Sequence, residues 1–120
     1  MIGRAEKDIV AAIMNYLAIR PDLVVWRQNV GALSIEGATG NRFIRFGRVG
    51  QADITGIMAG GRRLEIEVKG PKGRQSDTQR EFEAEISRLG GLYFIARSVQ
   101  DVIDALPEVG QGGKVERRKG

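Results

Sequence analysis

The chain has 120 residues, of which 42% are apolar, enough for the hydrophobic core of one domain. It contains neither cysteine nor histidine, which excludes disulfide scaffolds, thiolate zinc sites, cysteine nucleophiles and histidine general bases. Any catalysis must therefore use carboxylates, lysine, hydroxyl groups or a hard metal ion bound by oxygen. The formal net charge of +4 mildly favours nucleic acid as a partner, although an uninvolved basic surface explains it equally well.

No stretch approaches the roughly 20 apolar residues of a membrane span, and the N-terminus lacks the apolar core of a signal peptide. These features predict a cytoplasmic protein without membrane association.

The N-terminal segment has the pattern of an amphipathic helix. Between residues 5 and 19, apolar side chains recur with the spacing of one helix face, and Arg20-Pro21 predicts the helix end. Glu6 lies four residues before Val10 and so shares the side of the apolar stripe. A carboxylate there requires a polar partner, although the helix dipole alone also favours a first-turn glutamate.

Two strands are predicted next, at residues 23–29 and 42–46, from their β-branched and aromatic content. The glycine-rich stretch between them, GALSIEGATGN, is predicted to be a mobile connection. Trp26 is interpreted as a core residue rather than as a platform for base stacking.

Residues 52–58 and 63–69 alternate polar and apolar side chains around Gly60-Gly61, which indicates a β-hairpin. A two-residue turn would place Asp53 opposite Val68 and mix polar with apolar side chains on both faces. A three-residue loop or a bulge instead places Asp53 opposite Glu67. This second register is predicted, with Ala52, Ile54, Met58, Leu64, Ile66 and Val68 facing the core and Asp53, Thr55, Glu65, Glu67 and Lys69 facing away from it.

A loop at residues 70–75 precedes a second helix, with Ser76 as the predicted N-cap and Gln79 as its capping-box partner. The predicted apolar stripe of this helix is Phe82, Ile86 and Leu89, ended by Gly90-Gly91.

The apolar run LYFIA, residues 92–96, predicts a strand buried on both faces. Because a helix separates it from residues 63–69, the two strands are predicted to be parallel. A short last helix is predicted from Val99 to before Pro107. Residues 108–120 are predicted to form a disordered basic tail.

The predicted register places Asp53 and Glu67 directly opposite each other, with side-chain stems roughly 5 Å apart. Like charges there are destabilising unless a cation lies between them. Lys69 lies on the same face, roughly 6.6 Å further along the strand. Oxygen ligands without His or Cys favour Mg²⁺ or Mn²⁺ over zinc. Solvation of an outer strand face also explains a lone Glu-x-Lys, but Glu6 and Gln79 add polar groups on inward-facing sides.

The order helix with Glu6, strand, hairpin with Asp53 and Glu67-Val68-Lys69, helix, strand resembles the αβββαβ core of the PD-(D/E)XK nucleases. That core is an α/β fold whose mixed sheet is flanked by helices. The stretches GRVGQADITGI and LEIEVKGPKGRQSDTQREFEAEISRLGGLYFIARS resemble the virus-type replication-repair nuclease (VRR-NUC) branch in particular. The resemblance covers nearly the whole chain and implies a nuclease domain over residues 1–107. One departure is Ala52, where many PD-(D/E)XK enzymes have proline before the aspartate.

This resemblance implies a metal-dependent DNA endonuclease of bacterial or phage origin, which cleaves branched DNA such as four-way junctions in replication, repair or recombination. It implies that Lys69 deprotonates or only positions the attacking water, and that Gln79 lies at the edge of the site. The metal, Mg²⁺ or Mn²⁺, would be bound by Asp53, Glu67, the Val68 carbonyl and Glu6, the last directly or through water.

Basic residues of the hairpin and the following loop are expected near this site and are candidates for contacts with backbone phosphates. They are Arg62, Arg63, Lys72 and Arg74.

A homodimer is expected, because a four-way junction has two-fold symmetry and needs two cuts. Two alternatives remain open: a nucleic-acid-binding module on the same fold that has lost catalysis, and a basic α/β domain that binds another partner.

Overall fold

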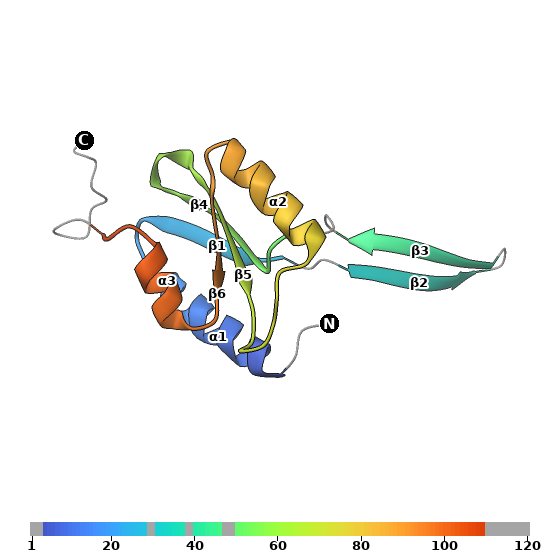
Figure 1. Ribbon diagram of the computed structural model, residues 1–120. Helices are drawn as coiled ribbons and strands as arrows, with labels where there is room; N and C mark the ends of the chain where they lie inside the picture. The colour runs from blue at the N-terminus through green and yellow to red at the C-terminus, as the bar shows by residue number, and fades with distance from the viewer. Residues whose placement is uncertain (1–3, 29–30, 38–39, 47–49, 110–120) are drawn as a thin grey trace.

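The computed structural model describes residues 4–28, 31–37, 40–46 and 50–109 (Figure 1). Among these residues, no helix is both long and apolar enough to cross a membrane. Most of the predicted basic tail, residues 110–120, lies outside the described ranges. In chain order the elements are α1 (Arg4–Ala18), β1 (Leu23–Arg27), β2 (Gly31–Gly37), β3 (Gly40–Phe46), β4 (Ile54–Met58), the 3₁₀ turn η1 (Ala59–Gly61), β5 (Arg63–Val68), α2 (Asp77–Arg88), β6 (Leu92–Ala96) and α3 (Val99–Ala105).

Four strands form one mixed sheet in the order β1-β4-β5-β6. β4 is antiparallel to both of its neighbours, β1 and β5, whereas β5 and β6 are parallel. The parallel pair confirms the prediction that α2 connects two parallel strands. The expected α/β architecture, a mixed sheet flanked by helices, is therefore present.

β2 and β3 pair with each other in a separate hairpin, which extends away from the four-stranded sheet in Figure 1. The predicted mobile connection is therefore wrong for residues 31–37 and 40–41, while residues 38–39 lie outside the described ranges. Pairing between the two strands supplies backbone hydrogen bonds for this glycine-rich stretch. β3, the partner of β2, contains the strand that was predicted at residues 42–46.

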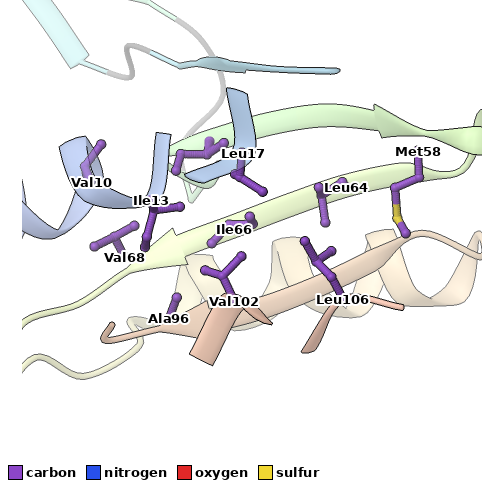
Figure 2. Packing of buried hydrophobic residues seen from close by; sticks show 11 residues of the cluster. Val10, Ile13, Leu17, Met58, Leu64, Ile66, Val68, Ala96, Val102 and Leu106 are labelled. Carbon is purple, nitrogen blue, oxygen red and sulfur yellow. The ribbon is translucent and has the colours of Figure 1, made fainter. Parts of the chain in front are cut away.

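The main hydrophobic core lies between one face of the sheet and the helices α1 and α3 (Figure 2). Helix α1 contributes Val10, Ile13 and Leu17, which lie on one helix face at intervals of three and four residues. The other buried members of this core are Ile54, Met58, Leu64, Ile66, Val68, Ala96, Val102 and Leu106.

Helix α2 covers the opposite face of the sheet, where Phe82 packs with Ala52 and Tyr93. The rings of Phe82 and Tyr93 meet edge to face, with their centroids 6.2 Å apart. The expected position of Ala52 in the main core is thus wrong. Ala52 precedes β4, so the two-residue alternation of the strand does not determine its direction.

Two further burial predictions are wrong. Leu89 is 73% exposed, because α2 ends at Arg88 and Gly90, with φ of 94°, turns the chain away from the helix face. Trp26 is 42% exposed. It lies on the edge strand β1, opposite Thr55, whereas α2 packs against β6 at the other edge of the sheet.

The hairpin of β4 and β5 has the predicted register, in which Ile54 pairs with Ile66. The three-residue turn η1 joins the two strands, and the Met58 N–H donates to the Arg62 carbonyl across it at 2.8 Å. Continued by one residue, this register brings Asp53 level with Glu67, as predicted.

Gly50, which lies shortly before Asp53, contacts the first turn of α2. Its φ is 85°, and an added Cβ would lie 2.4 Å from the Thr78 carbonyl oxygen. Gly60 has nearly the same φ, 87°, but an added Cβ would meet nothing within 4 Å. The two glycines therefore share a backbone conformation and differ in their surroundings.

We predict that Gly50→Ala lowers the free energy of unfolding substantially more than Gly60→Ala. Gly60→Ala should cost about 1–2 kcal/mol, the penalty of a left-handed conformation. Gly50→Ala adds a clash with backbone that cannot move without displacing α2. Urea unfolding of both variants measures the difference, and equal losses would contradict the close packing of Gly50 on α2.

Candidate active site

Asp53 lies immediately before β4, at the point where β4 stops pairing with β5. Its side chain continues the pairing, because Asp53 Oδ2 accepts a hydrogen bond from the Val68 N–H at 2.8 Å. Its carbonyl accepts from the Gln28 N–H at 2.8 Å. The Val68 N–H thus holds the Asp53 carboxylate at the end of β5, and the Gln28 N–H holds the Asp53 backbone.

The Val68 carbonyl lies on the same side of β5 as this carboxylate. The N–H and C=O of one strand residue point toward the same neighbouring strand. The Val68 N–H points to Asp53, whereas the next N–H, that of Lys69, donates to the Ala96 carbonyl on β6 at 3.1 Å. The Val68 carbonyl therefore has the direction expected of a ligand in this site.

Glu67 is buried on the face of the sheet that α2 covers, with an exposed fraction of 4%. Its Oε2 accepts a hydrogen bond from Gln79 Nε2 at 2.9 Å and lies 3.4 Å from Lys69 Nζ. Its other oxygen, Oε1, is buried and has no hydrogen-bond partner among the residues that the structure describes. Burial of an unpaired oxygen is unfavourable. A ligand from outside the chain, such as a cation, would satisfy this atom.

The pKa of Glu67 is raised to about 8, first by burial and second by the nearby Asp53 carboxylate, while Lys69 acts in the opposite direction. Burial also raises the pKa of Asp53. Each carboxyl group also acts on the other, and the raised pKa of Glu67 favours its protonated form in the metal-free protein at neutral pH. A cation between the two groups would replace that proton.

Gln79 has both of the roles considered for it. Its backbone N–H donates to Ser76 Oγ and its Oε1 accepts from the Ser76 N–H, which completes the predicted capping box. Its Nε2 meanwhile donates to Glu67. The start of α2 thus orients the buried Glu67 carboxylate.

Glu6 points inward from α1, as predicted, and its Oε2 accepts from the Gly70 N–H at 3.0 Å. The Gly70 carbonyl accepts from Arg97 Nη1 at 2.6 Å. Both polar groups of Gly70 are therefore held, one by α1 and one by the residue that follows β6. Glu6 thereby fixes the chain directly after Lys69.

The described ranges contain no group of three or more His, Cys, Asp or Glu side chains placed to hold a metal ion together. Mg²⁺ commonly uses one or two carboxylates and keeps several waters, so a pair of carboxylates suffices. The oxygen donors that fit such an ion are the Asp53 carboxylate, the free Glu67 Oε1 and the Val68 carbonyl.

The basic residues predicted near the site divide into two groups. Arg62 and Arg63 lie at the start of β5, roughly 20 Å from Lys69 at the strand rise of about 3.3 Å per residue. Arg62 donates to the Gly90 carbonyl and Arg63 pairs with the buried Glu65. Their expected proximity to the site is therefore wrong.

The other two predicted basic residues, Lys72 and Arg74, lie in the loop that directly follows Lys69. They line one hollow together with Arg97.

Arg97 and Glu65 were missed as residues of interest. Arg97 follows β6, the strand parallel to β5, and parallel strands end at the same edge of a sheet, so the predicted topology contained a signal for it. Glu65 was expected to be solvated on the outer face, but it is fully buried and accepts a hydrogen bond from Thr55.

The sequence matches no protein-family model and no curated protein.

The raised pKa of Glu67 predicts a dependence of stability on pH. Its ordinary pKa is 4.5 and its folded-state value is about 8, so the folded protein binds this proton more tightly than the unfolded chain. The associated stability is fully present below about pH 4.5 and is lost as the pH rises through about 8. Glu67→Gln stays neutral, so without divalent metal its melting temperature relative to wild type should rise between about pH 5 and pH 9.

Glu81→Gln, on the exposed side of α2, is the control for loss of a glutamate elsewhere. At about pH 8, Mg²⁺ should raise the melting temperature of the wild type and of Glu81→Gln but not of Glu67→Gln. A pH-independent difference between wild type and Glu67→Gln would contradict the buried proton.

Proposed function

We propose that this chain is a Mg²⁺- or Mn²⁺-dependent DNA endonuclease of the PD-(D/E)XK type, in the VRR-NUC branch, which hydrolyses phosphodiester bonds. The observation that carries the proposal is the buried Glu67 beside the partly buried Asp53, with an unpartnered Glu67 oxygen and Lys69 Nζ 3.4 Å from the other oxygen. Ionising both carboxyl groups at this place is costly unless a cation lies between them.

The order of the elements supports the same proposal. Leaving out the β2–β3 hairpin, the chain runs α1, β1, β4, β5, α2, β6, which is the αβββαβ order. The paired carboxylates lie on the central strands β4 and β5, or directly beside them. On this proposal, the β2–β3 hairpin is an insertion between the first two strands of the nuclease core.

Mg²⁺ or Mn²⁺ would be held by the Asp53 and Glu67 carboxylates and the Val68 carbonyl. When bound, such an ion supplies Lewis-acid polarisation of the phosphate and acidifies water. The chain keeps these ligands in place: the Val68 N–H holds the Asp53 carboxylate and Gln79 holds that of Glu67. The Glu67 oxygen without a partner is left available for the ion.

Lys69 lies beside this pair, and its side chain is 14% exposed, so solvent and substrate can reach part of it. From this position it counters negative charge on the phosphate and positions the attacking water. Glu6 contributes indirectly, because its contact with Gly70 fixes the backbone that carries Lys69.

The proposed substrate is branched DNA such as four-way junctions, on the resemblance of the sequence. The described residues offer cationic loop side chains rather than a helix for reading bases, which favours recognition of DNA structure through phosphates. The proposed role is in replication, repair or recombination.

We predict that Asp53→Asn and Glu67→Gln each lower DNA cleavage by more than about 100-fold, the upper loss typical of outer-shell changes at metal sites. Gln79→Ala should lower cleavage by about 10–100-fold, because it frees the Glu67 side chain. The assay is Mg²⁺-dependent cleavage of linear, flap and four-way DNA, with DNA binding measured in parallel.

Ser76→Ala is the matched control for Gln79→Ala, because it removes the helix cap but leaves the Gln79 contact with Glu67 available. It should lose stability by about 1 kcal/mol and keep most of the activity. Full cleavage by Asp53→Asn, or undiminished cleavage in EDTA, would overturn the proposed function. DNA binding without cleavage under any metal condition would favour the inactive binding module instead.

We also predict a homodimer, because two related active sites match the two cuts of a symmetric junction. Light scattering at micromolar concentration should give twice the mass of one chain, 13.1 kDa. A strict monomer that cleaves four-way junctions symmetrically would contradict this assembly.

A further inference from the structure

A basic hollow of about 580 Å³ lies beside the loop that follows β5. Its described lining contains three cationic side chains and no acidic residue. The lining residues are Pro71, Lys72, Gly73, Arg74 and Arg97. Three like charges around one concave surface attract an anion.

The charges of this hollow are not neutralised within the described part of the chain. None of Lys72, Arg74 and Arg97 forms an ion pair there. The nearest acidic contact recorded for Arg97 is Asp101, whose carboxylate accepts from the Arg97 backbone N–H at 2.8 Å. The guanidinium itself is not paired with that carboxylate.

Arg97 is held in one orientation by a single hydrogen bond. Its Nη1 donates to the Gly70 carbonyl at 2.6 Å. A guanidinium carries five N–H donors in a planar fork, so others remain for a ligand. Such a fork matches two oxygens of a phosphate, and fixing it beforehand lowers the entropy cost of binding.

The hollow adjoins the candidate active site. Val68 and Ala96 are register partners on the parallel strands β5 and β6, so Lys69 and Arg97 leave neighbouring strands at the same edge. One turn of chain separates the two sites, closed by the Gly73 N–H and the Gly70 carbonyl at 3.1 Å.

The far side of this turn contacts the acidic site. A Cβ added to Gly73 would lie 3.2 Å from Lys69 Cδ and 3.5 Å from Glu6 Oε2. Because glycine lacks that atom, the turn that lines the basic hollow packs closely against Lys69 and Glu6.

We propose that this hollow binds a second backbone phosphate of the nucleic acid, beside the phosphate that is cleaved, with Arg97 as its positioning ligand and Lys72 and Arg74 as further contacts. The inference rests on the proposed function in taking DNA as the ligand. Two phosphates of one strand, held on either side of the turn, would set which bond faces Lys69.

The test measures DNA affinity as a function of salt. Full-length Glu67→Gln protein, used to prevent cleavage, is titrated onto fluorescent four-way DNA at a series of KCl concentrations. Adding Arg97→Gln should reduce the slope of log affinity against log salt by about 0.7–0.9, the value of one phosphate contact. Lys72→Gln should shift the slope in the same direction without touching the Gly70 contact, which guards against a folding defect in Arg97→Gln.

The matched control is Arg88→Gln, which removes an exposed arginine from the last turn of α2, and it should leave the slope unchanged. Slopes equal to that of the parent for both Arg97→Gln and Lys72→Gln would overturn the inference, as would equal losses for Arg88→Gln. Cleavage by the wild type reports separately on the proposed function. If the wild type never cleaves while Arg97→Gln and Lys72→Gln reduce the slope, the inference stands and the proposed nuclease activity is wrong. If cleavage is normal and depends on Asp53 while the slopes are unchanged, the proposed function stands and the second phosphate site is wrong.

Discussion

The register between β4 and β5 is the constraint on which the rest of the molecule depends. Ile54 pairs with Ile66 because a three-residue turn joins the strands, and a slip of one residue would send every side chain of β4 to the opposite face. Asp53 would then lie level with Val68 instead of Glu67. The same pairing thus closes the hydrophobic core on one face and assembles the carboxylates on the other.

The carboxylate face is unusual because it is buried rather than solvated. Glu65 and Glu67 both lie beneath neighbouring side chains, and each leaves one oxygen without a hydrogen bond among the described residues. Glu65 is compensated locally by Thr55 and Arg63. Glu67 instead lies beside a second acid, and its pKa is raised first by burial and then by the Asp53 carboxylate. Glu65 therefore belongs to a structural ion pair with Arg63, whereas Glu67 belongs to the candidate catalytic site.

Gly70 joins the parts of the site that come from distant segments. Its N–H is held by Glu6 of α1 and its carbonyl by Arg97 after β6, so the loop that follows Lys69 has a defined course. That loop separates the acidic site from the basic hollow, and its glycine at position 73 allows the close approach. The proposed catalytic site and the proposed phosphate-binding hollow would therefore lie on the two sides of one short turn.

The sequence by itself determined the features that depend on near neighbours along the chain. Strand alternation and the need to segregate polar side chains predicted the register of the hairpin, and Ser76 with Gln79 predicted the helix start. It could not determine which groups from distant segments meet. Glu6 required a partner, but only the packing of α1 against the end of β5 showed that this partner is the Gly70 N–H.

Tertiary structure also decided what covers each face, and therefore the exposure of Trp26 and the burial of Glu65. It decided that Arg62 and Arg63 lie at the end of β5 far from Lys69, while Arg97 follows β6 at the same end of the sheet as Lys69. The physical reason is that periodicity reports the two faces of an element, whereas contacts between elements depend on their lengths, their order in the sheet and the helices packed on them.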